Sequence, residues 1–422
     1  MRKNVGLPLL LAAAATGILL FQACLKDSVV TTYKVYTPIY ALKSAVLAAL
    51  NGSPSQPIHQ AGQLYIKDNY IYLNEPDKGI HIIDNTDPTH PLQTAFLSIP
   101  GNGNVAIHGN ILYADMYTDL LAIDITDPRH ATITGGLHNA FPYRSTTPDS
   151  NFILTNWVIH DTVIHSRSMS GSQGLYFVRG TNILTYNQAA ASLAAASTSS
   201  TGTAGSTATM ALVGNYLYAV PERHTLGVIS LANPNNPAFV KNISAGYDLE
   251  TIFPLRDKLL LGSMEGVYIY SLADPAAPSQ LSLFSHGRAC DPVIADAENA
   301  YVTLRSGTWC GGAANELDVL DAHDLSNATL LKTYALNSPT GLGKDGNTLF
   351  VCDSPAVRIF DATQPAGLQQ LNTIPVSKAY DLIAANKRLI IASTDGLYQY
   401  DYSDPAHPTL LSHLLIQPTA NE

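Results

Sequence analysis

The chain has 422 residues, of which 13% are charged, and its formal net charge is −10. This balance, without any cluster of Lys and Arg, argues against nucleic acid as a partner, because binding to phosphates depends on clustered basic side chains. The chain contains 22 Tyr but only 5 Met, and abundant Tyr is typical of half-buried strands.

The first residues have the order of a bacterial export signal. Arg2 and Lys3 are followed by a mostly apolar run, 5–21, and then by a small residue and Cys24. A positive start, an apolar stretch and a small residue are typical of a signal peptide, and a Cys directly after the cleavage point is where bacterial lipoproteins are acylated. We therefore predict a signal peptide over residues 1–23 and lipidation, including palmitate, at Cys24.

Two features of this region leave alternatives open. Phe21 and Gln22 depart from the residues that usually precede an acylated Cys, so an uncleaved anchor or an ordinary cleaved signal remains an alternative. Residues 25–28 are either a weak surface-export signal or a solvated tether. A lipid at Cys24 would hold the protein on the cell outer membrane, facing either the periplasm or the cell surface.

Residues 24–58 connect this signal to the rest of the chain. Within them, Lys34–Tyr40 is predicted to form a strand. Residues 41–50 are apolar and have high helix propensity, which predicts one short helix.

A turn between two apolar runs recurs along the rest of the chain. Its copies read IIDNTDPTHP (82–91), AIDITDPRHA (122–131), VISLANPNNP (228–237), IYSLADPAAP (269–278), VLDAHDLSNA (319–328), IFDATQPAGL (359–368) and QYDYSDPAHP (399–408). Most copies are about 40 residues apart, as in repeat architectures. The Asx residues are expected to cap their own backbone in these turns, rather than to bind calcium.

A second signature lies upstream of each turn. It is a short apolar run, a polar pair and another apolar run, which predicts a hairpin. Four short strands in about 40 residues are typical of a propeller blade rather than of a solenoid repeat. We predict an all-β fold with a single β-propeller over residues 59–416, with seven four-stranded blades or, alternatively, eight, and a tail at 417–422.

An insertion at about 141–207 interrupts the repeat. Its end, 189–209, is nearly all Ala, Ser, Thr and Gly, a composition that is not expected to order itself. Segments 156–166 and 174–180 read as strands. They form either a long excursion from blade 2 or a degenerate eighth blade.

Several phrases resemble the LVIVD-repeat β-propeller lipoproteins of Bacteroidetes. They are NEPDKGIHIIDNTDP (74–88), LYADMYTDLLAIDITDP (112–128) and CDPVIADAENAYVTLRSGTWCGG (290–312). The resemblance covers residues 59–416 apart from the low-complexity insert. It implies a propeller in the cell envelope and implies no activity.

Three cysteines remain besides Cys24. Cys290 begins strand A of blade five and Cys310 lies in the B–C loop of the same blade, which places both on one face. An exported protein can be oxidised there, so we predict a Cys290–Cys310 disulfide, with two unpaired buried thiols as the alternative. Cys352 reads as a small core residue.

Acidic residues gather in the B–C loops and at the starts of the A strands. We predict that they meet on one face and bind a ligand or a cation, for which Ca²⁺ is the best candidate; solvated loop acids are the alternative. The candidate residues are Glu75, Asp115, Glu250, Asp291, Arg305 and Asp381.

The enzyme motifs HExxH and GxSxG, the Walker loop and the Rossmann fingerprint are missing from the sequence. The favoured function is therefore a non-enzymatic binding or scaffold module of the envelope, without a cofactor other than a possible Ca²⁺ ion. Its partner would be a protein or a glycan at the acidic face. The alternative is a hydrolase or lyase that uses acids at the mouth of the propeller channel.

Overall fold

The computed structural model describes residues 28–50, 53–167, 192–193, 203–206, 208–289, 292–308 and 310–417. The chain divides into two compact units, one of residues 1–40 and 155–187 and the other of residues 41–154 and 188–422. The predicted signal peptide and Cys24 lie outside the described residues, as do Cys290 and Asp291. Lipidation and the disulfide therefore stay predictions.

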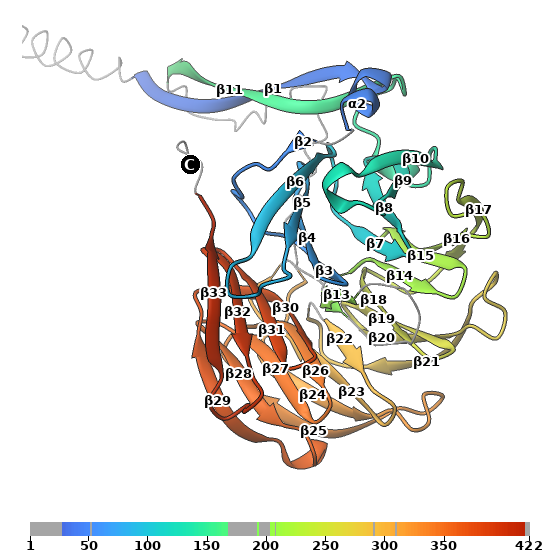
Figure 1. The fold of residues 1–422 in the computed structure, drawn as a ribbon, viewed down its shortest axis with the longest axis vertical. Helices are drawn as coiled ribbons and strands as arrows, with labels where there is room; N and C mark the ends of the chain where they lie inside the picture. Colours follow the sequence, from blue (N-terminus) through green and yellow to red (C-terminus); the bar gives the residue numbers. More distant parts are fainter. Residues whose placement is uncertain are drawn as a thin grey trace, which may run out of the picture. The chain divides into compact units, whose positions relative to one another are not determined.

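The second unit is a ring of seven four-stranded antiparallel sheets (Figure 1). We name the strands of each blade A to D in chain order. They are β3 (Leu64–Lys67), β4 (Tyr70–Glu75), β5 (Gly79–Asp84) and β6 (Leu92–Ser98) in blade 1; β7 (Val105–His108), β8 (Ile111–Met116), β9 (Asp119–Asp124) and β10 (Thr132–Leu137) in blade 2; β14 (Met210–Val213), β15 (Tyr216–Glu222), β16 (Thr225–Ser230) and β17 (Ala238–Ser244) in blade 3; β18 (Leu249–Leu255), β19 (Lys258–Ser263), β20 (Gly266–Ser271) and β21 (Ser279–Ser285) in blade 4; β22 (Val293–Ala295), β23 (Asn299–Leu304), β24 (Glu316–Asp321) and β25 (Thr329–Ala335) in blade 5; β26 (Pro339–Asp345), β27 (Thr348–Asp353), β28 (Ala356–Asp361) and β29 (Gln369–Pro375) in blade 6; and β30 (Ala379–Ala385), β31 (Arg388–Ser393), β32 (Gly396–Asp401) and β33 (Thr409–Leu415) in blade 7.

The A strands form the inner wall of the ring. Each contacts the A strand of the next blade, and β30 of blade 7 contacts β3 of blade 1. This closed set of contacts confirms the seven-bladed propeller and rules out the eight-bladed alternative.

The turns account for the repeat seen in the sequence. Asp87, Asp127, Asp274, Asp324 and Asp404 each accept a hydrogen bond from the backbone N–H two residues further on, at 2.9–3.1 Å. This confirms that the aspartates cap the C–D turns. In each of the seven blades the C–D pairing then shifts register after the turn, and such bulges increase the twist of a blade.

The C–D turns also join neighbouring blades. The main-chain carbonyl of Pro234 accepts a hydrogen bond from the Tyr113 hydroxyl of the preceding blade, at 2.9 Å. We call this contact a turn bond. Equivalent turn bonds join Tyr218 to Pro275, Ser282 to Leu325, Tyr334 to Pro365, Asn372 to Ala406 and Ser412 to Pro88.

The first and last blades close the ring without exchanging a strand. An apolar cluster joins Leu64, Leu73 and neighbours in blade 1 to Ile390, Leu397 and neighbours in blade 7. Around this cluster the Gln417 N–H donates to the Ile58 carbonyl at 2.8 Å, and the Gln399 amide donates to Asn85 at 2.7 Å. Closure therefore depends on side-chain packing and a few peripheral hydrogen bonds.

The first unit contains a two-stranded sheet formed by β1 (Ser28–Leu42) and β11 (Phe152–Arg167). Tyr36 and Trp157 meet edge to face across it, with ring centroids 6.4 Å apart. The predicted strand at 34–40 is part of β1. The strand predicted at 156–166 is part of β11 and belongs to an excursion from blade 2, whereas 174–180 lies outside the described residues.

The low-complexity end of the insertion departs from expectation. Two short strands, β12 (Ser192–Leu193) and β13 (Thr203–Ser206), form within it. β13 pairs with the inner strand β3, Thr203 opposite Ile66, and both strands contact A strands of other blades. The expectation that 189–209 would carry no ordered structure is wrong at these positions, because an exposed inner strand edge offers backbone hydrogen bonds that composition alone does not reveal.

A short helix, α2 (Lys43–Ala49), confirms the helix predicted at 41–50 and is followed by β2 (Ser53–Pro54). Val46 and Leu47 pack against the apolar core of blades 1 and 2. The Lys43 ammonium forms an ion pair with Asp119 at the start of β9, which fixes the helix to blade 2. Among the described residues, none of the helices has the length and apolar character to cross a membrane.

Candidate functional site

One face of the ring carries the D–A and B–C connections, because each A strand begins and each B strand ends there. We call it the D–A face. The sequence placed its candidate binding residues on this face. The structure places Glu75 at the end of β4, Asp115 near the end of β8, and Glu250 and Asp381 early in β18 and β30.

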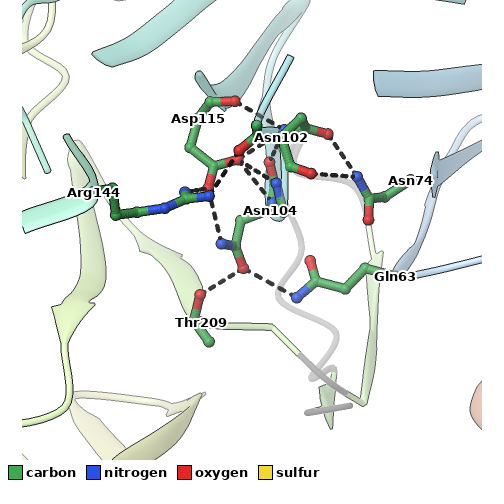
Figure 2. Close-up of polar contacts among 9 residues, drawn as sticks. Gln63, Asn74, Asn102, Asn104, Asp115, Arg144 and Thr209 are labelled. Atoms are coloured by element: carbon green, nitrogen blue, oxygen red, sulfur yellow. Dashed lines mark hydrogen bonds and ion pairs between the residues drawn. The ribbon is translucent and has the colours of Figure 1, made fainter. Parts of the chain in front are cut away.

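A buried polar network surrounds Asp115 (Figure 2). One oxygen of this carboxylate accepts hydrogen bonds from the backbone N–H groups of Gly103 and Asn104, both at 2.8 Å, and from the Asn102 amide at 2.7 Å. The other oxygen accepts from the Asn104 amide at 3.1 Å. Asp115 thus holds the D–A connection against the end of its own blade.

The same network joins three blades. The Asn74 amide of blade 1 donates to the Asn102 side chain at 2.7 Å. Asn104, just before β7, accepts from Gln63, just before β3, at 3.0 Å, and from Thr209, just before β14. The starts of three consecutive A strands are therefore fixed to one another by side chains, as Figure 2 shows.

Arg144 brings a cation to this network from the insertion. It ends the short 3-10 helix Pro142–Arg144, pairs with Asp115, and donates to the Gly101 carbonyl at 2.7 Å. Its side chain is 22% exposed, whereas that of Asp115 is 1% exposed. The buried carboxylate thus holds a partly exposed guanidinium in place on the D–A face.

Glu75 has a separate set of partners in blade 1. It pairs with the buried His81 ring at 2.8 Å and accepts from the His59 N–H at 3.2 Å. The His81 ring also packs on Phe96, with centroids 4.5 Å apart. Glu75 therefore anchors the chain that enters blade 1.

Glu250, Arg305 and Cys310 come together at blades 4 and 5. The Cys310 sulfur lies 3.0 Å from the Glu250 carboxylate. Burial lowers the pKa of Arg305 from its usual value, and the nearby Glu250 charge partly offsets this effect. The structure thus brings these predicted residues together, while their predicted neighbours Cys290 and Asp291 lie outside the described residues.

Asp381 lies where the ring closes. Its carboxylate is fully buried and accepts from the N–H groups of Leu382, at 3.0 Å, and Leu64 of blade 1, at 3.4 Å. Asp353 is a second buried acid that binds loop backbone, in blade 6, where it accepts hydrogen bonds from the N–H groups of Asn337 and Ser338 at 2.7 and 2.8 Å. Buried acids on this face hold loop backbone in place.

Three carboxylates of the predicted acidic face are exposed, namely Asp77, Glu265 and Asp395. Among the residues that the structure describes, no three His, Cys, Asp or Glu side chains are grouped as metal ligands would be. The predicted calcium site includes Asp291, and its occupancy stays untested.

Sequence reasoning missed the amides and Arg144. It considered only titratable side chains, whereas Asn74, Asn102, Asn104 and Gln63 form most of the network. Asn102 and Asn104 stand in a Gly-Asn-Gly-Asn phrase just before an A strand, and this phrase is a signal that could have found them. Arg144 lies in the long excursion from blade 2, which the other blades lack, so the repeat pattern could not indicate it.

Comparison with known proteins supports the repeat assignment. The family model described as "LVIVD repeat" matches residues 59–94 and 204–244. No curated protein matches. A protein from Lactobacillus plantarum has a similar structure, with 12% identity over 85% of this chain and 97% of that chain and a TM-score of 0.56. The computationally designed Ika8 protein is 10% identical over 86% and 90% of the two chains, with a TM-score of 0.51; at such identities the likeness concerns the fold alone.

The chain is thus a seven-bladed β-propeller. The two matches lie in blades 1 and 3, and together with the seven blades they support the LVIVD-repeat β-propeller family.

Proposed function

We propose that this protein is a binding or scaffold propeller of the bacterial cell envelope, held on the outer membrane by a lipid at Cys24. The membrane part of the proposal is supported by the order of Arg2, Lys3, an apolar run and Cys24. The binding part is supported by the resemblance to envelope propellers and by the D–A face, which would meet a protein or glycan partner.

One observation carries the binding role: the network around Asp115 fixes the starts of three A strands and holds the partly exposed Arg144. A partner gains affinity when the groups it meets are already ordered, because less conformational entropy is lost on binding. Asp77, Glu265 and Asp395 add exposed acids to the same face. A partner with basic or hydroxyl groups fits this surface best.

The anchor is tested by growing cells with an alkyne analogue of palmitate and comparing the natural chain with Cys24→Ala. The natural chain should be labelled and found with the membranes. The variant should be unlabelled and found in the soluble fraction. A labelled variant would contradict the lipid anchor.

The binding face is tested by photocrosslinking in cells. A photoreactive benzoyl-phenylalanine is placed at Asp77, Glu265 or Asp395 on the D–A face. Matched controls carry it at Asp87, Asp274 or Asp404, which are exposed in C–D turns on the opposite face. We expect a discrete adduct from the D–A positions that Arg144→Ala weakens. Adducts only from the control positions would place the partner on the other face.

A further inference from the structure

The β1–β11 sheet, which we call the ribbon, has an exposed apolar surface. Eleven large apolar side chains of its described residues are exposed: Tyr33, Val35, Tyr36, Ile39, Tyr40, Leu42, Phe152, Trp157, Val158, Ile159 and Val163. Consecutive residues such as 32–37 are all exposed. Because successive side chains of a strand point to opposite faces, both faces of the sheet carry exposed side chains.

We propose that this sheet lies in the headgroup region of the membrane, beside the lipid at Cys24. A two-stranded sheet is at best marginally stable in water without a surface to pack against. The sheet therefore needs another surface to cover its apolar side chains. The choice of a membrane as that surface rests on the proposed lipid anchor.

Chain length supports this choice. β1 begins at Ser28, four residues after Cys24. A fully extended chain spans at most about 3.5 Å per residue, so the strand begins within about 14 Å of the acylated residue. An anchored protein would thus hold β1 at the membrane surface.

The side chains also suit the headgroup region. Tyr and Trp favour the boundary between water and hydrocarbon, where an apolar ring and a polar group are both accommodated. The three Tyr residues of β1 (33, 36 and 40) and Trp157 supply four such rings. The open edges of the sheet exclude a position within the hydrocarbon core, since unpaired backbone groups stay hydrated only at the interface.

Charge does not drive the contact. The chain has a net charge of −10, so an anionic bilayer repels it overall. Among the ribbon side chains described, Lys34 and Asp161 are the charged residues, besides His160. Binding should therefore not be weakened by salt, and it should be at least as strong on neutral vesicles as on anionic ones.

The test uses the mature chain with Cys24→Ala and Trp309→Phe, which leaves Trp157 as the sole tryptophan. Vesicles of phosphatidylethanolamine and phosphatidylglycerol are added, with or without brominated acyl chains. We expect the Trp157 emission to shift to shorter wavelength and the brominated lipid to quench it. The ribbon variant Val158→Thr with Ile159→Thr keeps the β propensity of the strand but should bind about tenfold more weakly, because two exposed aliphatic contacts are lost.

A matched control replaces two apolar residues of the propeller, Leu281→Thr with Leu283→Thr, which are 40% and 39% exposed in β21. It should bind vesicles like the parent chain. Absence of quenching, or equal binding by the ribbon variant, would overturn the proposal. So would a dimer in sedimentation analysis that the ribbon variant abolishes, because a second copy would then cover the apolar side chains.

Failure of the lipid anchor gives a different result. The vesicle assay uses an unlipidated chain, so it does not depend on acylation. If alkyne-palmitate labelling fails while Trp157 still binds vesicles, the anchor is wrong and the ribbon alone contacts the membrane. If labelling succeeds and the vesicle assay fails, the anchor stands and the ribbon proposal is lost.

Discussion

Blade 1 is joined to its two neighbours in different ways. Towards blade 2 the joint adds a polar part to a shared apolar core, with Asn74 and Gln63 bonded to Asn102 and Asn104 around the buried Asp115, and we call it the polar joint. Towards blade 7 the joint is an apolar cluster that contains Leu64 and Leu397. Hydrogen bonds require fixed distances and directions, whereas apolar packing tolerates small shifts. The polar joint therefore sets the geometry of the D–A face, and the apolar joint mainly holds the ring closed.

Removal of the acid from the polar joint should have the largest effect. Asp115→Ala leaves Arg144 and two loop N–H groups without their acceptor, and we expect the free energy of unfolding to fall by about 3–5 kcal/mol. Urea unfolding followed by circular dichroism measures this. Asp353 also accepts from two loop N–H groups, in blade 6, but its ion pair with Arg358 is longer, at 3.4 Å, so Asp353→Ala should cost less, about 1–3 kcal/mol. Equal losses would mean that the closer pair with Arg144 adds nothing beyond the pair with Arg358.

Truncation in the apolar joint should come next. Leu397 is 1% exposed, and Leu397→Ala should lower the free energy of unfolding by about 2–4 kcal/mol through the cavity it creates. Because the network around Asp115 stays intact, this variant should leave the crosslinks from the D–A face unchanged, whereas Arg144→Ala should weaken them. Leu331→Ala, at an exposed position, serves as the control and should change stability by less than about 0.5 kcal/mol. Lost crosslinks in Leu397→Ala would show that both joints set the face.

The ion pair between Lys43 of α2 and Asp119 of blade 2 makes a pH-dependent contribution to the free energy of unfolding. Burial alone would raise the pKa of Asp119, but hydrogen bonds from Lys43 and the Asn139 N–H outweigh burial, so this pKa lies below its usual value. A carboxyl with a lowered pKa stabilises the fold above its unfolded pKa of about 3.9, and this contribution is lost as the pH falls through the folded value.

Asp119→Asn should accordingly cost about 1–3 kcal/mol at pH 7. The difference from the natural chain should shrink towards pH 3. Unfolding curves at both pH values measure it, with Lys43→Met as a second variant that removes the same pair. A constant difference across this range would show that Asp119 acts through packing rather than charge.

The smallest effect concerns the turn bonds. Ser412→Ala removes the turn bond that reaches Pro88 across the ring closure, and Ser282→Ala removes the one between blades 4 and 5. Each should lower the free energy of unfolding by about 1 kcal/mol. A clearly larger loss in Ser412→Ala, seen in the same urea titration, would show that ring closure depends on this bond more than other joints do.

The repeat made most of the fold predictable. The spacing of the C–D turns and the polar pair between strands A and B correctly predicted seven four-stranded blades, because turn chemistry is local and recurs. The joints between blades were harder to predict. Asn102 meets Asn74 and Asp115 only after the D–A connection folds back, and Tyr113 meets Pro234 across 121 positions. β13 pairs with the inner edge of β3, where Thr203 lies opposite Ile66, a residue 137 positions earlier in the chain.

The turn bonds have a consequence for how such proteins gain and lose blades. The acceptor is a main-chain carbonyl, so its side chain is free to change, and Leu325 accepts in blade 5 where other turns have Pro. Blades 2 to 7 each bring a donor for the following blade, and blades 3 to 7 also bring an acceptor for the preceding one. If any of blades 3 to 7 is duplicated or deleted as a whole, the new junction again has both halves of its bond. Propellers built this way can change their number of units during evolution by simple recombination, without compensating substitutions at the new junction.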